Sequence, residues 1–259
     1  MSAIGPKIRT IAEKLLIPVI LIAAWWTISA GSVNPFFPPL AAIITQFPET
    51  WFGDRVFSDV LPSLGRLGLG LFLSAIIGIA LGMLIGTTPW LRTFLEPSLE
   101  FARAIPAPAM VPILMVLVGI GDTMRITVIV VGTIWPILLN TIEGVRNIDI
   151  TLRDTCEVFH FRPTTKLRVL MLRSASPQIF VGLRQGLSIG IILMVVSEMF
   201  AATDGIGFSL IQFQRSFSLV EMWTGIIMLG ILGVILASLF VLVERRVLSW
   251  YYATKMLDN

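Results

Sequence analysis

Six apolar stretches constrain the fold of this chain more than any other feature of its sequence. One crossing of a bilayer takes about 20 apolar residues in an α-helix, and each stretch is close to that length. Lipid offers the backbone no hydrogen bonds, so only helices and closed barrels can span it. The sequence therefore predicts an all-α membrane protein with six transmembrane helices in a single domain, residues 1–259. The stretches are roughly 15–31, 67–87, 99–118, 124–142, 179–201 and 222–243.

The composition agrees with this class. Of the 259 residues, 56% are hydrophobic and 14% are charged, whereas a soluble domain has about 25% charged residues. The N-terminus resembles a signal peptide but has no clear cleavage site before Asn34–Pro35, so we expect a retained first helix. The third stretch contains Pro106, Pro108 and Pro112, and we expect a kinked helix there because neighbouring groups can satisfy the freed carbonyls.

Lysine and arginine residues are distributed unevenly between the connecting segments. With the N-terminus placed inside, thirteen fall in inside segments, four fall outside, and Arg103 and Arg184 lie within apolar stretches. Positive charge favours the cytoplasmic side, so we expect both termini to be cytoplasmic, a cytoplasmic loop at about 143–177, and outer loops at about 32–60 and 202–221. The inside residues are Lys7, Arg9, Lys14, Arg92, Arg146, Arg153, Arg162, Lys166, Arg168, Arg173, Arg245, Arg246 and Lys255, and the outside residues are Arg55, Arg66, Arg125 and Arg215.

Small residues recur every fourth position in the second and fifth stretches. This spacing places them on one helix face, where another backbone can approach closely. Packing within one subunit and packing between subunits both explain such a face. The positions are Gly70, Ser74, Gly78, Gly82 and Gly86 in the second stretch, and Gly182, Gly186 and Gly190 in the fifth.

Three ionisable residues, Arg103, Arg184 and Glu198, lie at or near membrane depth. Charges there are costly and indicate a pathway or a buried pair. Arg184 is close enough to the cytoplasmic end to extend its charge to the interface. Glu198 is a candidate for a translocation or gating role. The outer segment that follows, from Asp204 to Phe213, fits a short helix dipping back toward the membrane or an ordinary surface turn.

No enzyme motif is present. None of the four lysines is followed by Ser or Thr, so the chain has no P-loop. The single histidine, His160, cannot form a two-histidine zinc motif, and the single cysteine, Cys156, excludes an internal disulfide and paired-cysteine metal sites. We therefore expect no enzymatic activity and no metal site. The placement of the basic residues suits membrane orientation and gives no reason to expect a nucleic-acid partner.

The segment 154–173 is the most polar insertion in the cytoplasmic part of the chain. Thr151 and Asp154 have the spacing of a capping box, which predicts a helix over about 152–160. Pro163 fits the first turn of a second helix, whose apolar positions leave its basic residues on other faces. This pattern is typical of a helix on the membrane surface, and a docking element for a partner is the alternative.

Several segments resemble the permease subunits of bacterial ABC importers, in the nitrate, sulfonate and taurine branch of the binding-protein-dependent permeases. The resemblance extends from about residue 15 to 250. It is carried by "PSLGRLGLGLFLSAIIGIALGMLIG", "EPSLEFARAIPAPAMVPILMVLVGIGD", "WPILLNTIEGVRNID" and "SPQIFVGLRQGLSIGIILMVVSEMFAATDGIGFSLI".

In that family the loop between the fourth and fifth spans carries the EAA motif, which starts with Glu-Ala-Ala, continues with a glycine four residues later and ends with a proline. The short coupling helix of this loop fits a cleft in the cytoplasmic ATPase subunit. The motif's start falls on Asp154, Thr155 and Cys156, its glycine on His160 and its final proline on Arg173. A histidine can occupy the left-handed conformation of that glycine at a cost, which predicts a reshaped turn or a break moved to Arg162–Pro163. Loss of the proline predicts a second helix that continues toward the membrane. The residues expected at the ATPase are Asp154, Thr155, Cys156, Glu157, Phe159, His160, Phe161, Arg162, Pro163, Thr164, Thr165 and Lys166.

The resemblance implies a type I ABC importer-like transmembrane domain in the bacterial plasma (inner) membrane. The expected partners are a second permease subunit, identical or paralogous, two cytoplasmic ATPase subunits that hold ATP and Mg, an external solute-binding protein, and membrane lipid. The translocation path or gate is expected to involve Glu198, Gly182, Gly186 and Gly190, and the solute to be small and anionic or aromatic. The alternatives are a stand-alone six-helix channel or secondary transporter, followed by a membrane-embedded enzyme.

Overall fold

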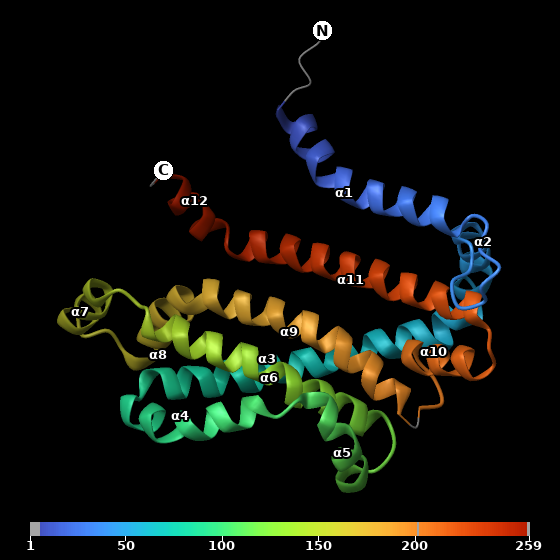
Figure 1. Ribbon diagram of the computed structural model, residues 1–259. Helices are drawn as coiled ribbons and strands as arrows, with labels where there is room; N and C mark the ends of the chain where they lie inside the picture. Colours follow the sequence, from blue (N-terminus) through green and yellow to red (C-terminus); the bar gives the residue numbers. More distant parts are fainter. Residues whose placement is uncertain (1–5, 201, 258–259) are drawn as a thin grey trace.

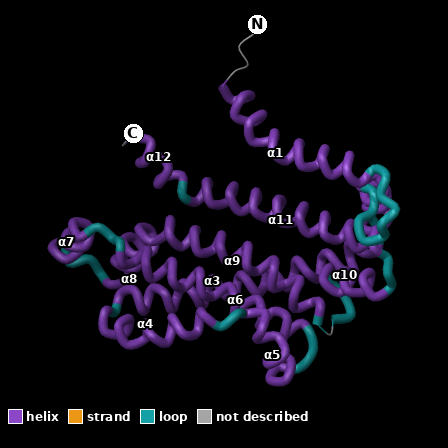
Figure 2. Tube along the Cα trace, viewed as in Figure 1, coloured by secondary structure: helices purple, strands orange, loops and turns teal. Residues whose placement is uncertain are grey.

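The computed structural model describes the backbone of residues 6–200 and 202–257 and the side chains of residues 16–200 and 202–253. The regular structure of this part of the chain is helical (Figures 1 and 2). The α-helices are Pro6–Ser29 (α1), Leu40–Trp51 (α2), Leu61–Thr87 (α3), Pro89–Ala104 (α4), Val111–Val118 (α5), Asp122–Arg146 (α6), Ile150–Val158 (α7), Pro163–Thr165 (α8), Arg173–Met199 (α9), Ile206–Arg215 (α10), Leu219–Val247 (α11) and Ser249–Leu257 (α12). Val56–Val60 and Lys166–Leu172 are π-helical, and Ala107–Met110 is a 3₁₀ turn.

The centre of the fold is a layer of three long helices in which α6 lies against both α3 and α9. The small-residue face of α3 receives side chains of α6 in a constant register, each pair being 59 positions apart. A methyl group at Gly70 would lie 2.6 Å from Ile129, and one at Gly82 would lie 2.6 Å from Thr141. Ser74 Oγ lies 2.6 Å from Thr133 Oγ1 in the same register. Partner numbers rise together, so α3 and α6 run parallel.

The glycines of α9 are buried between this helix and its neighbours α6 and α3. A methyl group at Gly182 would lie 2.7 Å from the Pro136 carbonyl oxygen, and one at Gly190 would lie 2.9 Å from Leu67. Gly186 lies against Ile137 in the same contact. This close approach explains the three glycines by packing within one subunit, and their expected place along a translocation path stays a prediction.

The proline-containing third stretch is broken into two helices. Helix α4 ends at Ala104, and the segment Ala107–Val118, which contains the 3₁₀ turn and α5, departs from the direction of α4 by 82°. The expected kink is therefore confirmed and is sharp. The break begins at Ile105, whose extended conformation precedes Pro106, as steric conflict with the proline ring requires.

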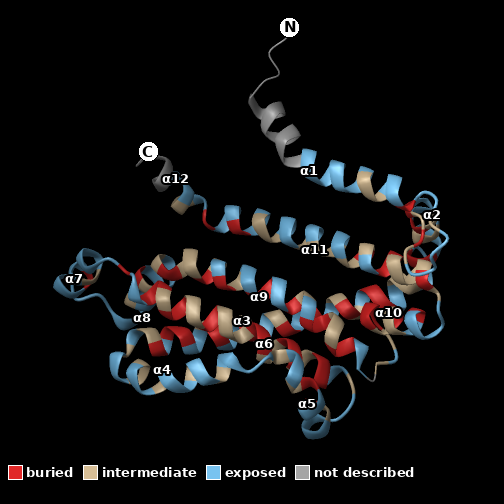
Figure 3. Cartoon of the chain, in the orientation of Figure 1, coloured by how far each residue is buried: buried red, intermediate tan, exposed pale blue. Residues whose placement is uncertain are grey.

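Helices α2, α10 and α11 pack together at one end of the layer, opposite the end where α7 projects (Figure 1). The segment 32–60, expected as an outer loop, contains α2, and the short helix expected after Asp204 is present as α10. Trp51 is fully buried there and donates from Nε1 to Thr224 Oγ1 at 2.9 Å. Few residues of α11 are buried in the single chain, and the others are intermediate or exposed (Figure 3).

Within the part of the chain that the structure describes, length and hydropathy identify four helical segments that can cross a membrane, or five if the bent pair counts as one span. They contain the second, fourth, fifth and sixth apolar stretches. The first stretch lies mostly in α1, which is apolar over Leu16–Ser29. The membrane class is confirmed by these segments, whereas six spans and cytoplasmic termini stay predictions. The four segments are Val56–Thr87, Asp122–Arg146, Pro163–Met199 and Leu219–Val247.

Candidate functional site: a buried charge cluster and an exposed two-helix segment

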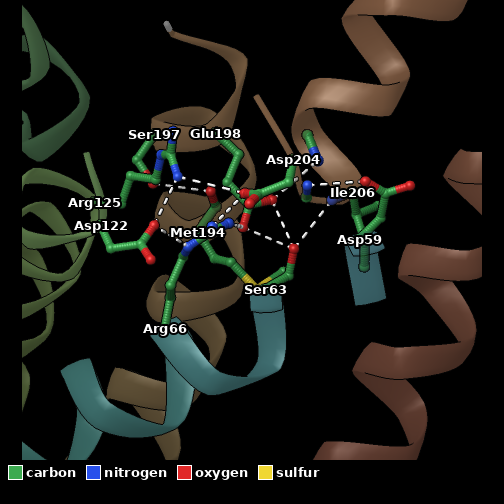
Figure 4. A network of polar contacts seen from close by, with 12 residues as sticks. Asp59, Ser63, Arg66, Asp122, Arg125, Met194, Ser197, Glu198, Asp204 and Ile206 are labelled. Atoms are coloured by element: carbon green, nitrogen blue, oxygen red, sulfur yellow. Dashed lines mark hydrogen bonds and ion pairs between the residues drawn. The ribbon is translucent and has the colours of Figure 1, made fainter. Parts of the chain in front are cut away.

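A cluster of charged side chains lies at one end of the three-helix layer, where α3, α9 and α10 meet (Figure 4). At its centre Arg66 Nη1 of α3 lies 2.9 Å from Glu198 Oε1 of α9. The Arg66 side chain is 4% exposed and that of Glu198 is 0% exposed. A buried ion pair overcomes the cost of desolvation only with good geometry and further hydrogen bonds. Ser63 supplies one of these, because its hydroxyl lies 2.7 Å from Glu198 Oε1.

The first turn of α10 is held by side chains of other elements. Backbone N–H groups of Gly205, Ile206 and Gly207 donate to Asp59, Ser63 and Glu198, at 3.0, 3.0 and 3.1 Å respectively. These N–H groups would have no partner within α10 itself, and the positive end of the helix dipole favours the two carboxylates. The cluster therefore anchors α10 to α3 and α9.

Gly205 is required at this junction for two reasons. Its φ is +110°, which side-chain-bearing residues rarely adopt, and a methyl group would lie 2.5 Å from Glu198 Cδ. A glycine thus allows the Glu198 carboxylate to lie directly against the backbone at the start of α10.

Two acidic residues extend the cluster toward its surface. Arg66 pairs with Asp204, and its Nε lies 2.8 Å from Asp122 Oδ1. Arg125, which is buried, donates from Nη1 to Asp122 at 2.7 Å. Asp122 and Asp204 are 62% and 40% exposed in their side chains, so the carboxylates at the rim keep partial access to solvent.

The other ionisable residues predicted at membrane depth are also paired. Arg184 pairs with Glu244 of α11, and the Tyr252 hydroxyl of α12 donates to Glu244 at 2.9 Å. The hydrogen bond to this carboxylate raises the pKa of Tyr252. Arg103 pairs with Glu100 one turn earlier at 2.5 Å, and both side chains are about half exposed. Arg103 therefore belongs to the surface of α4.

At the opposite end, α7 begins at a different residue from the one predicted. The N-cap is Asp149, whose carboxylate accepts from the Thr151 backbone N–H at 2.6 Å. The prediction of a capping box starting at Thr151 is wrong, because Asp149 has an extended backbone and offers its carboxylate two residues earlier. Hydrogen bonds from the Thr151 side chain and backbone lower the pKa of Asp149.

His160 ends α7 in the left-handed conformation that usually requires glycine. Its φ is +49°. Its N–H donates to Glu157 at 3.0 Å, and the next N–H, of Phe161, donates to Cys156 at 3.1 Å, which is the hydrogen-bond pattern of a Schellman C-cap. The two expected outcomes, a reshaped turn or a break moved to Arg162–Pro163, are therefore wrong. Histidine adopts the glycine conformation at an energetic cost.

Most residues expected at an ATPase are exposed on the projecting segment formed by α7, α8 and the turn between them. Of the twelve, Cys156 is buried in a cluster with Val145 and Leu170, Lys166 is half-buried, and the other ten are exposed. Lys166 Nζ lies 3.3 Å from Glu157 Oε1, which joins the two short helices. Phe159 and Phe161 present neighbouring exposed rings.

One unbroken helical run joins the projecting segment to the buried charge cluster. It starts at Pro163, passes through the π-helical stretch and ends at Met199, 37 residues in all. The prediction that the second helix continues toward the membrane is confirmed. Glu198 lies in its last turn.

Sequence reasoning found Glu198 but missed its partners. The distribution of positive charge placed Arg66 and Arg125 in outer segments and assigned them no role. A usable signal existed, because five charged residues border apolar stretches on the same predicted side, namely Arg66, Asp122, Arg125, Glu198 and Asp204. Among the described residues, no group of three or more His, Cys, Asp or Glu could hold a metal ion.

These features define a multi-pass helical membrane protein with a buried ionic anchor at one end and an exposed helical projection at the other. Residues 74–249 match the family described as "Binding-protein-dependent transport system inner membrane component". The chain belongs to this family of permease subunits. The family membership and permease function predicted from the sequence are confirmed.

Similar proteins cover nearly the whole chain. A putative aliphatic sulfonates transport permease, SsuC of Bacillus subtilis, is 29% identical over 92% of this chain and 87% of its own. The taurine transport permease TauC of Escherichia coli is 26% identical over 95% and 92%. The nitrate import permease NrtB of Leptolyngbya laminosa is 31% identical over 95% and 91%.

A solved structure shows the same fold. An inward-facing structure of the MetNI methionine ABC transporter matches with a TM-score of 0.60 and 22% identity, over 78% of this chain and 97% of that chain. The expected fold class, an all-α transmembrane domain like that of an ABC importer, is therefore confirmed.

Proposed function

We propose that this chain forms half of the translocation path of an ATP-driven importer for a small anionic solute in a bacterial plasma membrane. Relatives named for sulfonate, taurine and nitrate transport support this solute class. The other half of the path is a second permease subunit, identical or paralogous. A solute-binding protein outside the cell delivers the solute. ATP and Mg bind to two cytoplasmic ATPase subunits, since this sequence contains no P-loop.

The observation that carries this proposal is the unbroken helix from Pro163 to Met199. It connects the exposed segment, which the family resemblance assigns to the ATPase, with Glu198 at the opposite end. A helix of this length spans about 55 Å. Movement of the ATPase subunits at Asp154–Lys166 would therefore reach the contact of α9 with α3 and α10, which we place at the outer gate.

The test uses the complete transporter in liposomes, with ATPase subunits and binding protein. Replacing Phe159 and Phe161 together with Ser removes exposed apolar surface from the projecting segment without touching the core. We expect solute-stimulated ATP hydrolysis and uptake to fall at least about tenfold, because interface aromatics dominate binding energy. Phe57→Ser, at an exposed ring near the opposite end, is the matched control.

Two results would contradict the proposal. Unchanged uptake in the Phe159/Phe161 variant would remove this segment from coupling. Solute uptake by the permease alone, without ATPase subunits or ATP, would favour the alternative of a stand-alone channel or secondary transporter.

A further inference from the structure

A basic pocket lies at the end of the three-helix layer that is predicted to be cytoplasmic. Its volume is about 350 Å³, and it is formed between the end of α3, the start of α4, the end of α6, and α7. Its charged lining consists of Arg92, Arg146, Arg153, Lys166 and Glu157. One carboxylate against four cationic side chains leaves the pocket with a net positive charge, which suits an anion.

The cationic side chains of the pocket differ in the partners that they already have within the chain. Arg153 donates from Nη2 to the Val145 carbonyl at 2.7 Å and so holds the end of α6. Arg146 pairs with Glu143, and Lys166 with Glu157, both at partly or largely exposed positions. Exposed pairs of this kind are weak, so these cations remain able to bind a stronger anionic group.

An apolar groove continues from the pocket along the outer surface of α3. Its volume is about 690 Å³, and it lies between α3 and the helical run that starts at Pro163. Ala80, Met83 and Leu84 form one wall, and Leu167 lies on the other. Thr87, Lys166 and Met171 line both the basic pocket and the groove. The two therefore form one continuous amphipathic site.

The position of the site matches the boundary between headgroups and hydrocarbon. The groove follows the last turns of an apolar spanning helix, and the basic pocket begins where that helix ends at Thr87. Exposed Trp90 and Phe94 stack nearby, with ring centroids 5.8 Å apart, and aromatic residues gather at membrane interfaces. Basic pockets between spanning helices on the cytoplasmic side bind anionic lipid headgroups.

We propose that this site binds one anionic phospholipid, with its phosphate group in the basic pocket and an acyl chain in the apolar groove. The lipid contacts α3, α6 and the start of the long helical run together, so it braces the base of the projecting segment. The proposal depends on the membrane class of the chain and is independent of the transport proposed above.

Native mass spectrometry of the purified full-length chain tests this binding, with phosphatidylglycerol, phosphatidylcholine and inorganic phosphate as probes. We expect the unchanged chain to retain phosphatidylglycerol in preference to phosphatidylcholine. Replacing Arg92 and Lys166 together with Gln should lower that preference about tenfold or more, at about 1 kcal/mol per basic residue. Arg168→Gln, an exposed arginine on the same helical run that lines neither region, is the control.

A second variant, Ala80→Phe, fills the groove without changing charge. It should lower retention of both phospholipids while leaving oligomeric mass unchanged. Displacement of phosphatidylglycerol by inorganic phosphate, with no effect of Ala80→Phe, would assign the pocket to free phosphate and overturn the proposal. Equal losses in the Arg168 control, or a changed oligomeric mass in Ala80→Phe, would overturn it as well.

Discussion

Arg66 and Glu198 form an ion pair across 132 positions of sequence, at 2.9 Å and almost fully buried. This contact joins α3 to α9, and the same carboxylate accepts the Gly207 N–H at the start of α10. Two neighbouring elements, α9 and α10, and the distant α3 thus depend on one acidic side chain. The energetic consequences of this dependence can be measured.

Removing Arg66 leaves the Glu198 carboxylate buried without a cationic partner, and we expect Arg66→Met to lower the free energy of unfolding by about 3–5 kcal/mol. Removing Glu198 leaves Arg66 paired with Asp122 and Asp204 but takes the acceptor from the Gly207 N–H, so we expect Glu198→Met to lower the free energy of unfolding by less. The double variant should lose much less stability than the two single variants together, because the Glu198 carboxylate is then no longer buried without its arginine. Unfolding in detergent micelles measures all three. Arg103→Met, at a half-exposed pair with Glu100, should cost at most about 1 kcal/mol, and an Arg66 effect no larger than this would contradict the prediction.

The close approach of α3 and α6 predicts different outcomes for two glycines of the same helix. A methyl group at Gly82 would lie 2.6 Å from Thr141 and 2.9 Å from the Leu138 carbonyl oxygen, whereas one at Gly68 would meet nothing within 4 Å. Gly82→Ala should destabilise the protein by about 1–3 kcal/mol through overpacking. Gly68→Ala should be neutral or stabilising by up to about 1 kcal/mol. Melting temperatures in one detergent compare them, and equal values would argue against this register.

The left-handed conformation of His160 predicts that glycine improves the turn. His160→Gly should stabilise α7 by up to about 1–2 kcal/mol, because a side chain in this conformation carries that cost. His160→Val should destabilise it, since a β-branched residue is least suited to positive φ. Hydrogen exchange of residues 150–161 measures both. Faster exchange in the glycine variant would show that the imidazole makes a stabilising contact.

The cap at Asp149 makes α7 sensitive to acid. A carboxylate whose pKa is lowered by folding contributes stability that is present above its ordinary value of 3.8 and is lost as the pH falls through the lowered value. Protection of α7 from hydrogen exchange, corrected for intrinsic rates, should therefore decline over that acidic range. Asp149→Asn keeps an acceptor and should remove the pH dependence, whereas Asp149→Ala should lose protection throughout.

The identity of the cap can be tested with a matched carboxylate. Asp154 lies in the same helix but does not cap it. Asp154→Ala should leave the protection of α7 and its pH dependence unchanged. A loss of protection like that of Asp149→Ala would instead support a capping box that begins at Thr151.

The apolar stretches predicted the long helices because hydrophobic length is a local property of the sequence. The cap of α7 was missed because Asp149, Thr151 and Asp154 are all suitable capping residues, and the backbone conformation chooses between them. The turn at His160 was missed because the cost of the left-handed conformation, about 1–2 kcal/mol, was expected to reshape the turn or move the break. Neighbouring packing can compensate for it.

The charge cluster could be predicted only in part. Glu198 stood out because it lies within an apolar stretch, whereas Arg66 lies at the edge of one and resembles a surface residue. Their pairing depends on the register between α3 and α9, which a single sequence does not specify. The glycine spacing predicted close packing but left the partner helix open, and the structure identifies α6.

The constant offset of 59 positions between α3 and α6 divides the chain into segments that tolerate length changes and segments that do not. One residue inserted within Gly70–Gly82 would rotate every later position by about 100° and bring bulky side chains against α6. Insertions between Thr88 and Gly121 would change the offset number without altering any contact of the two helices. Chains with this core can therefore vary in length between α3 and α6 outside Val111 and Leu114, which belong to the buried core, and new functions can be added there while the core stays intact.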